Sequence, residues 1–156
     1  MQLDVGQQSP DFTADSSQGT PLTLSDLRGR WVVLYFYPKD DTPGCTKQAC
    51  AFRDMHAKLS GKNVVVVGCS PDDLRSHDKF ISKYDLPFVL ISDPSREIAS
   101  TYGVWKEKNM YGKRIKGIER TTFLINPDGE IAKIWSRVRV DGHIDEIIDE
   151  LQMIAR

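Results

Sequence analysis

The sequence predicts an α/β fold, in which a mixed central sheet is flanked by helices and preceded by an N-terminal β-hairpin. Its middle alternates buried-strand patterns with helical patterns, which requires parallel strands joined by crossover helices. Residues 121–135 then show a strand–turn–strand pattern, which adds antiparallel strands. With 156 residues, the chain is long enough for a single domain, 1–156, with a full hydrophobic core.

The N-terminal third begins with extended segments and turns. Residues 12–14 and 22–24 flank a turn-rich segment and predict a hairpin. Residues 25–27 predict a short helical turn that Gly29 ends. Residues 31–37 are apolar on both faces, as in a central strand, and Pro38 ends that strand.

The alternating region continues with helices and strands in turn. Ser70 is a hydroxyl N-cap candidate, followed by proline and two acids, so a helix is expected from there to about Tyr84. The other elements expected here are a helix over 43–59 that Gly61 ends, strands over 63–69 and 88–92, and a short helix over 96–102.

The C-terminal part begins with a basic stretch, 106–119, which we expect to be an irregular solvated loop. Its sharper alternative is electrostatic support for Arg120 or a surface that docks a reductant. Strands over 121–125 and 130–135 follow, then a helix with isoleucine and leucine on one face. This order of elements is the thioredoxin-like arrangement with an N-terminal extension.

Composition excludes several function classes. The formal charge of −1 provides no global attraction to nucleic acid or to an anionic membrane. No apolar run is long enough for a transmembrane helix, and the first residues lack the basic and apolar regions of a signal peptide. We therefore expect a cytoplasmic protein with neither a nucleic-acid nor a membrane partner.

For several other polar and aromatic residues we expect structural rather than catalytic roles. The three histidines lie in separate segments without zinc-ligand spacing, and we expect them on the surface. Asp40 and Asp41 are expected to be turn residues rather than an acid–base pair. The three tryptophans are expected to pack in or near the core.

The cysteines point to sulfur chemistry. In a reducing compartment, so few cysteines are more often catalytic or redox-sensing than structural. A helix that begins near Pro43 places Cys45 in its first turn, where free N–H groups and the macrodipole favour the reactive thiolate. Thr42 can point its hydroxyl at the same spot. The alternative, an inert buried cysteine, is disfavoured because Thr42, the turn and Cys50 occur together.

Cys50 follows Cys45 by five residues. In an intact helix this spacing turns the second side chain by about 140° and moves it about 7.5 Å along the axis. A Cys45–Cys50 disulfide therefore requires the first helical turns to unwind. The alternative for Cys50 is a small core residue of the helix, and for Cys69 a buried small hydrophobe is the favoured interpretation.

The segment Pro38-x-x-x-Thr42-x-x-Cys45 resembles the peroxiredoxin active-site motif. The fuller run from Tyr35 to Cys50 is similar to the bacterioferritin-comigratory (Q-type) branch, and the resemblance extends over essentially the whole chain. Further matches are found at 10–12, 102–105 and 117–125.

The resemblance implies roles for individual residues. Cys45 would be the peroxidatic nucleophile, Thr42 would hydrogen-bond its thiolate and the bound peroxide, and Pro38 would shield the site from water. Arg120 stands at the position of the family's active-site arginine. Cys50 matches the resolving position used by part of the branch.

The same resemblance implies the reaction. Hydrogen peroxide and organic hydroperoxides would oxidise Cys45 to a sulfenic acid, and Cys50 would resolve it as an intramolecular disulfide. Thioredoxin (or glutaredoxin) would be the reductant, in antioxidant defence, and no metal, flavin or haem is implied. Because resolution is intramolecular, we expect a monomer.

Two other functions compete with this one. A thioredoxin-like disulfide oxidoreductase is disfavoured because such enzymes use Cys-x-x-Cys, which keeps both sulfurs within reach. A non-catalytic redox-sensing or chaperone-like module is disfavoured because it does not need Pro38, Thr42, Cys45 and Arg120 together.

Overall fold

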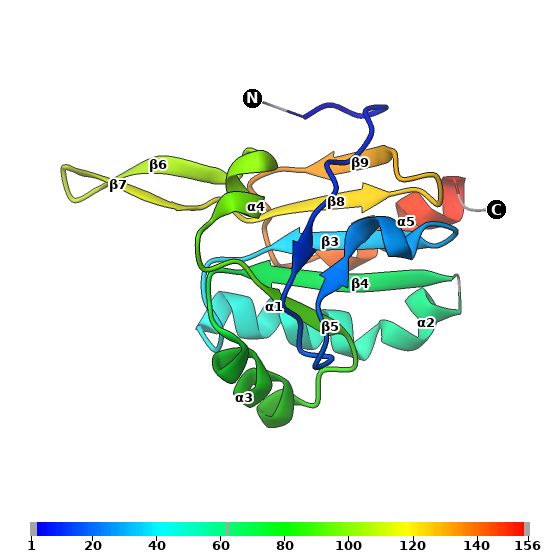
Figure 1. The fold of residues 1–156 in the computed structure, drawn as a ribbon, viewed down its shortest axis with the longest axis horizontal. Coiled ribbons are helices and arrows are strands. Elements are labelled where there is room, and N and C mark those ends of the chain that lie inside the picture. The colour runs from blue at the N-terminus through cyan, green and yellow to red at the C-terminus, as the bar shows by residue number, and fades with distance from the viewer. Residues whose placement is uncertain (1–2, 62, 155–156) are drawn as a thin grey trace.

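The architecture is described by a computed structural model, which covers residues 3–61 and 63–154. Its centre is a five-stranded sheet in the order β5-β4-β3-β8-β9 (Figure 1). β3 pairs in parallel with β4, and β4 with β5, whereas β3–β8 and β8–β9 are antiparallel. The strands of this sheet are β3 (Trp31–Phe36), β4 (Val64–Ser70), β5 (Val89–Ser92), β8 (Thr121–Ile125) and β9 (Ile131–Trp135). The predicted mixed sheet is confirmed.

Alternate residues of β3 point into two separate cores. Val32, Leu34 and Phe36 belong to one apolar cluster. Val33 and Tyr35 belong to the other. A strand buried on both faces has this pattern because successive side chains point to opposite sides of the sheet.

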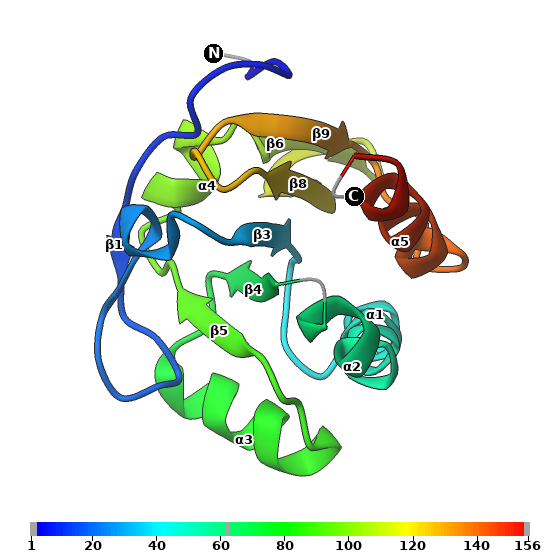
Figure 2. The same ribbon diagram turned by 90° about the vertical axis from the view of Figure 1, so that its right-hand side faces the viewer.

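Helices cover both faces of the sheet. α1 (Pro43–Asp54), α2 (His56–Ser60) and α5 (His143–Ile154) lie on one face, and α4 (Glu97–Thr101) and the short 3₁₀ helix η1 (Leu24–Leu27) lie on the other (Figure 2). α3 (Leu74–Tyr84) packs beside β5. The apolar face predicted for the last helix is confirmed, since Ile144, Ile147, Ile148 and Leu151 are buried. Within the described residues, no helix is long and apolar enough to cross a membrane.

The predicted N-terminal hairpin is present as β1 (Thr13–Ala14) and β2 (Leu22–Thr23). It is held against β5, because Ser17 donates its backbone N–H to the Leu90 carbonyl at 2.9 Å and Ser16 forms a bridge with Ile91. The extension therefore covers the sheet edge.

Two helix boundaries differ from prediction. The helix expected over 43–59 is broken at Met55, which leaves the helical conformation (φ −102°, ψ 4°) although no glycine or proline stands there. The third helix begins at Leu74 rather than at Ser70, and Asp73 caps it by accepting the Ser76 N–H at 2.9 Å. Ser70 instead ends β4, because it continues the parallel ladder opposite β5.

The basic stretch expected to be irregular is a hairpin, β6 (Trp105–Met110) and β7 (Lys113–Ile118), which projects from the body of the protein (Figure 1). Tyr111 and Gly112 both have positive φ, as two-residue hairpin turns require. Most side chains of β7 are exposed, so the sequence lacks the alternation of apolar and polar residues that predicts a strand.

The expectation that the histidines lie on the surface is wrong for two of them. His77 and His143 are buried, and only His56 is partly exposed. The tryptophans behave as predicted: Trp105 packs against one core cluster, and Trp31 and Trp135 pack against the other.

Candidate active site

The start of α1 holds the first of the predicted site residues. α1 begins at Pro43, with Thr42 as its extended N-cap residue, so Cys45 lies in the first turn as predicted. Its side chain is only 2% exposed. The first backbone N–H groups of a helix have no intrahelical acceptor, and Cys45 belongs to this first turn. This environment favours a negative charge at the sulfur.

Arg120, far away in the sequence, reaches the same place. It lies between β7 and β8, and its Nη2 donates to Cys45 Sγ at 3.3 Å. Its Nη1 donates to Gln48 Oε1 at 2.5 Å. A guanidinium beside the sulfur stabilises the thiolate and can donate to an oxygen bound there. The structure thus brings Cys45 and Arg120 into direct contact.

Gln48 is a site residue that the sequence reasoning missed. It is buried, and because Arg120 can only donate, Gln48 must present its oxygen to the guanidinium. The signal that could have found it is its spacing: residues three apart on a helix share a face, so Gln48 stands beside Cys45.

Gly44 explains how the guanidinium comes so close. A Cβ built on Gly44 would lie 3.2 Å from Arg120 Nη2, a tight contact. The missing side chain therefore leaves room for Arg120 against the helix start.

Thr42 and Pro38 line the turn that precedes α1. The Thr42 hydroxyl donates to the Lys39 carbonyl oxygen at 2.9 Å, so its proton is committed and its oxygen remains free to accept a hydrogen bond. Pro38 lies exposed in the same turn.

The two remaining thiols lie in different settings. Cys50 is half-buried on the same unbroken helix as Cys45, and both thiols are free. Cys69 lies within the buried part of β4 and belongs to the core cluster on the opposite side of the sheet from Cys45. Burial raises the pKa of the Cys69 thiol well above its usual value. The predicted interpretation of Cys69 as a buried small hydrophobe is confirmed.

Aromatic rings belong to the same buried cluster as the Cys45 thiol. Tyr35 stacks on Phe52 with ring centroids 4.6 Å apart and on Tyr37 at 5.4 Å, in the same cluster as Cys45. Burial, and then the nearby Cys45, raise the pKa of Tyr35 well above its usual value. The thiol therefore belongs to an apolar cluster and is in contact with a cation.

A thioredoxin-like sheet that presents a buried helix-start cysteine to an arginine defines a thiol-dependent redox enzyme. Residues 5–134 match the model of the AhpC/TSA family. A putative peroxiredoxin bcp of Coxiella burnetii is 52% identical over 97% of this chain and 100% of its own. Peroxiredoxin Bcp of Bacillus subtilis is 43% identical over 97% of each chain.

Solved structures agree with the sequence matches. A cysteine-to-serine variant of Xylella fastidiosa peroxiredoxin Q superposes with a TM-score of 0.94 at 36% identity, over 100% of this chain and 99% of that one. The bacterioferritin comigratory protein of Xanthomonas campestris gives 0.92 at 38% identity, over 98% and 100%. The chain belongs to the AhpC/TSA family, in the Bcp (peroxiredoxin Q) branch of the peroxiredoxins, and is a thiol peroxidase.

Proposed function

We propose that Cys45 is the peroxidatic nucleophile of this peroxidase, within a single peroxiredoxin domain formed by residues 1–156. The observation that carries the proposal is the 3.3 Å contact between Arg120 Nη2 and the sulfur of a buried helix-start cysteine. The thiolate attacks one peroxide oxygen and the O–O bond breaks. The other oxygen takes up a proton and leaves as water or alcohol, and Cys45 becomes a sulfenic acid.

The neighbours of Cys45 would stabilise this step. Arg120 and the free N–H groups of the helix start donate to the oxygen on which negative charge develops. Thr42, whose proton is held by Lys39, accepts from the peroxide O–H. Pro38 closes the outer side of the pocket against water.

Cys50 would resolve the sulfenic acid. Its thiolate attacks the Cys45 sulfur and the S–O bond breaks. The oxygen takes up a proton and leaves as water, and an intramolecular disulfide forms. Because both residues lie five apart on continuous α1, the beginning of that helix has to unwind for the sulfurs to meet. A dithiol donor, thioredoxin or glutaredoxin, then supplies two electrons and restores both thiols.

The substrates would be hydrogen peroxide and organic hydroperoxides. The Xanthomonas campestris relative is described as having alkyl peroxide reduction activity, which supports the second class for this chain. An intramolecular resolving thiol makes a second subunit unnecessary, so we propose a cytoplasmic monomer that acts in antioxidant defence.

Peroxide consumption with thioredoxin as reductant tests the assignments. Cys45→Ser should be inactive, and Cys50→Ser should form the sulfenic acid but fail to turn over. Cys69→Ser is the matched control and should be near normal, because Cys69 lies across the sheet. Peroxide turnover by Cys45→Ser would overturn the central assignment. A disulfide lost only in Cys69→Ser would overturn that of Cys50.

A further inference from the structure

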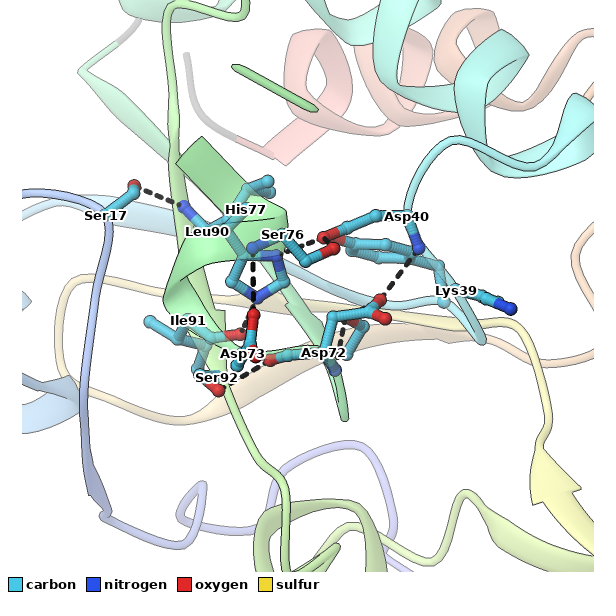
Figure 3. Close-up of polar contacts among 12 residues, drawn as sticks. Ser17, Lys39, Asp40, Asp72, Asp73, Ser76, His77, Leu90, Ile91 and Ser92 are labelled. Carbon is cyan, nitrogen blue, oxygen red and sulfur yellow. Dashed lines mark hydrogen bonds and ion pairs between the residues drawn. The ribbon is translucent and has the colours of Figure 1, made fainter. Parts of the chain in front are cut away.

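His77 is a fully buried histidine with an acceptor at each ring nitrogen. Its Nδ1 lies 2.7 Å from Asp40 Oδ2, and its Nε2 lies 2.9 Å from the Ile91 carbonyl oxygen (Figure 3). A neutral imidazole carries one N–H and one lone pair, so either neutral tautomer would point its lone pair at one of these acceptors. An imidazolium, paired with an Asp40 carboxylate, satisfies both contacts.

Both side-chain oxygens of Asp40 accept hydrogen bonds from other residues as well. The Tyr37 hydroxyl donates to Asp40 Oδ1 at 2.5 Å, and the Ser76 hydroxyl donates to Oδ2 at 2.7 Å. The Asp40 backbone N–H donates to Asp72 Oδ2 at 2.7 Å. The end of β3, the loop after β4 and helix α3 therefore all hold this one residue (Figure 3).

The turn that Asp40 occupies leads directly into the active site. Thr42, the N-cap of α1, follows two residues later, and its hydroxyl is bonded to the Lys39 carbonyl. Asp41 is held as well, because Lys83 Nζ and the Tyr84 hydroxyl each bond to its carboxylate at 2.7 Å. Residues at both ends of α3 are thus bonded to the turn that precedes Cys45.

We propose that His77 is a positioning residue of this peroxidase: its buried ion pair with Asp40 fixes the turn that carries Thr42 and the start of α1. Peroxide reduction therefore depends on the proton that the pair holds. The inference rests on the proposed role of Cys45. It adds a residue that touches neither the substrate nor the reacting sulfur.

The groups that face the ring determine how the pair responds to pH. The charged groups near the ring are Asp40, in the turn before α1, and Asp72, in the loop before α3. Tyr37 donates a hydrogen bond to Asp40, and the Ile91 carbonyl of β5 faces the other ring nitrogen. Burial alone lowers the pKa of His77, but the hydrogen bond and negative charge of Asp40 outweigh burial and raise it. The ion pair is therefore fully formed below the ordinary pKa of a histidine and is lost as pH rises through the raised pKa of His77.

The decisive experiment follows the rate constant for Cys45 oxidation by hydrogen peroxide in single turnovers between pH 5.5 and 9.5. In the wild type the rate should fall on an alkaline limb as His77 loses its proton. His77→Gln should be about tenfold slower at pH 7, because the turn is misplaced, and should lack the alkaline limb. A wild-type rate with an unchanged limb in His77→Gln would overturn the proposal.

Two variants sharpen the comparison. His143→Gln replaces the other buried histidine, which lies on α5, and should keep the alkaline limb. Asp40→Asn combined with His77→Gln should react faster than His77→Gln alone, since it no longer leaves a buried charge without a partner. A double variant no faster than the single one would count against the ion pair.

A measurement on the wild type keeps the proposal testable if His77→Gln fails to fold. The ring ¹⁵N resonances of His77 should show both nitrogens protonated at pH 7 and should titrate together with the alkaline limb of the rate. A neutral ring at pH 7 would overturn the proposal. If the wild type formed no sulfenic acid on Cys45, the proposed function would fail instead, while the ring resonances would still decide whether the pair exists.

Discussion

The guanidinium of Arg120 lies against Gly44, at a point where an added Cβ would be 3.2 Å from Nη2. The absent side chain at residue 44 therefore sets how closely the cation can approach Cys45, to which the same Nη2 donates at 3.3 Å. The start of α1 and the arginine are therefore in close contact although they lie far apart in the sequence.

Gly44→Ala should separate stability from activity. Alanine is the better helix former by up to about 1 kcal/mol, and Gly44 does not need a positive φ, so the free energy of unfolding should rise. The new methyl group displaces the guanidinium by a few tenths of an ångström, so Cys45 oxidation should slow about tenfold. Denaturant unfolding and stopped-flow oxidation measure the two effects. An unchanged oxidation rate would contradict the role given to this contact.

Arg120→Lys should slow Cys45 oxidation strongly, although the substitution keeps the positive charge. A lysine retains the charge but cannot donate to Gln48 and Cys45 at once from a planar fork. We expect Cys45 oxidation to slow about 100-fold, the effect of losing one oriented donor at a developing oxyanion. Arg114→Lys, on the exposed hairpin, is the matched control and should react at the wild-type rate. Equal rates in the two variants would show that the fork geometry is unimportant.

Gly68→Ala should destabilise the protein through overpacking. A Cβ on Gly68 would lie 2.7 Å from Leu90 Cδ2 and 2.9 Å from the Tyr35 hydroxyl oxygen, inside the packed sheet. Such insertions cost about 1–3 kcal/mol, which urea unfolding would report. Gly44→Ala is the natural comparison, because there the change in stability should have the opposite sign. A neutral Gly68→Ala would mean that Tyr35 and Leu90 can move apart freely.

The buried His143 should make the protein less stable in mild acid. Its Nε2 lies 2.9 Å from Thr122 Oγ1, and burial, followed by the positive charge of Arg120, lowers the pKa of His143 to about 4. The unfolded chain binds this proton more readily, so stability is full above the unfolded pKa and falls as pH drops towards about 4. The loss from this residue is up to about 3 kcal/mol. His143→Gln should flatten that part of the stability profile, measured by unfolding at each pH. A profile parallel to the wild type would exclude His143 as the cause.

The sequence predicted the features that depend on local patterning. The strand over 31–37 and the helix start at Pro43 carry their own apolar runs and cap residues, and both are found as expected. The β6–β7 hairpin was missed because a ribbon that projects into solvent has no apolar face to mark its period. The break at Met55 has no local signal at all, since neither glycine nor proline marks it.

Site residues divide in the same way. Cys45 stands in a turn that the sequence identifies. The role of Gln48 depends on its hydrogen bond with Arg120, which lies in the connection between β7 and β8. The same is true of His77, whose partners come from the turn before α1 and from β5. Long-range pairs of this kind are decided by tertiary packing, which no local pattern records.

The sheet that separates the two cores also restricts the oxidation chemistry. Three thiols could in principle join in three different pairs, and two of those pairs include Cys69. Because Cys69 lies on the far side of the sheet from Cys45 and from the helix that carries Cys50, the folded backbone forbids both. The sheet therefore keeps Cys69 apart from the cysteine that peroxide oxidises. The folded architecture itself prevents the two incorrect disulfides.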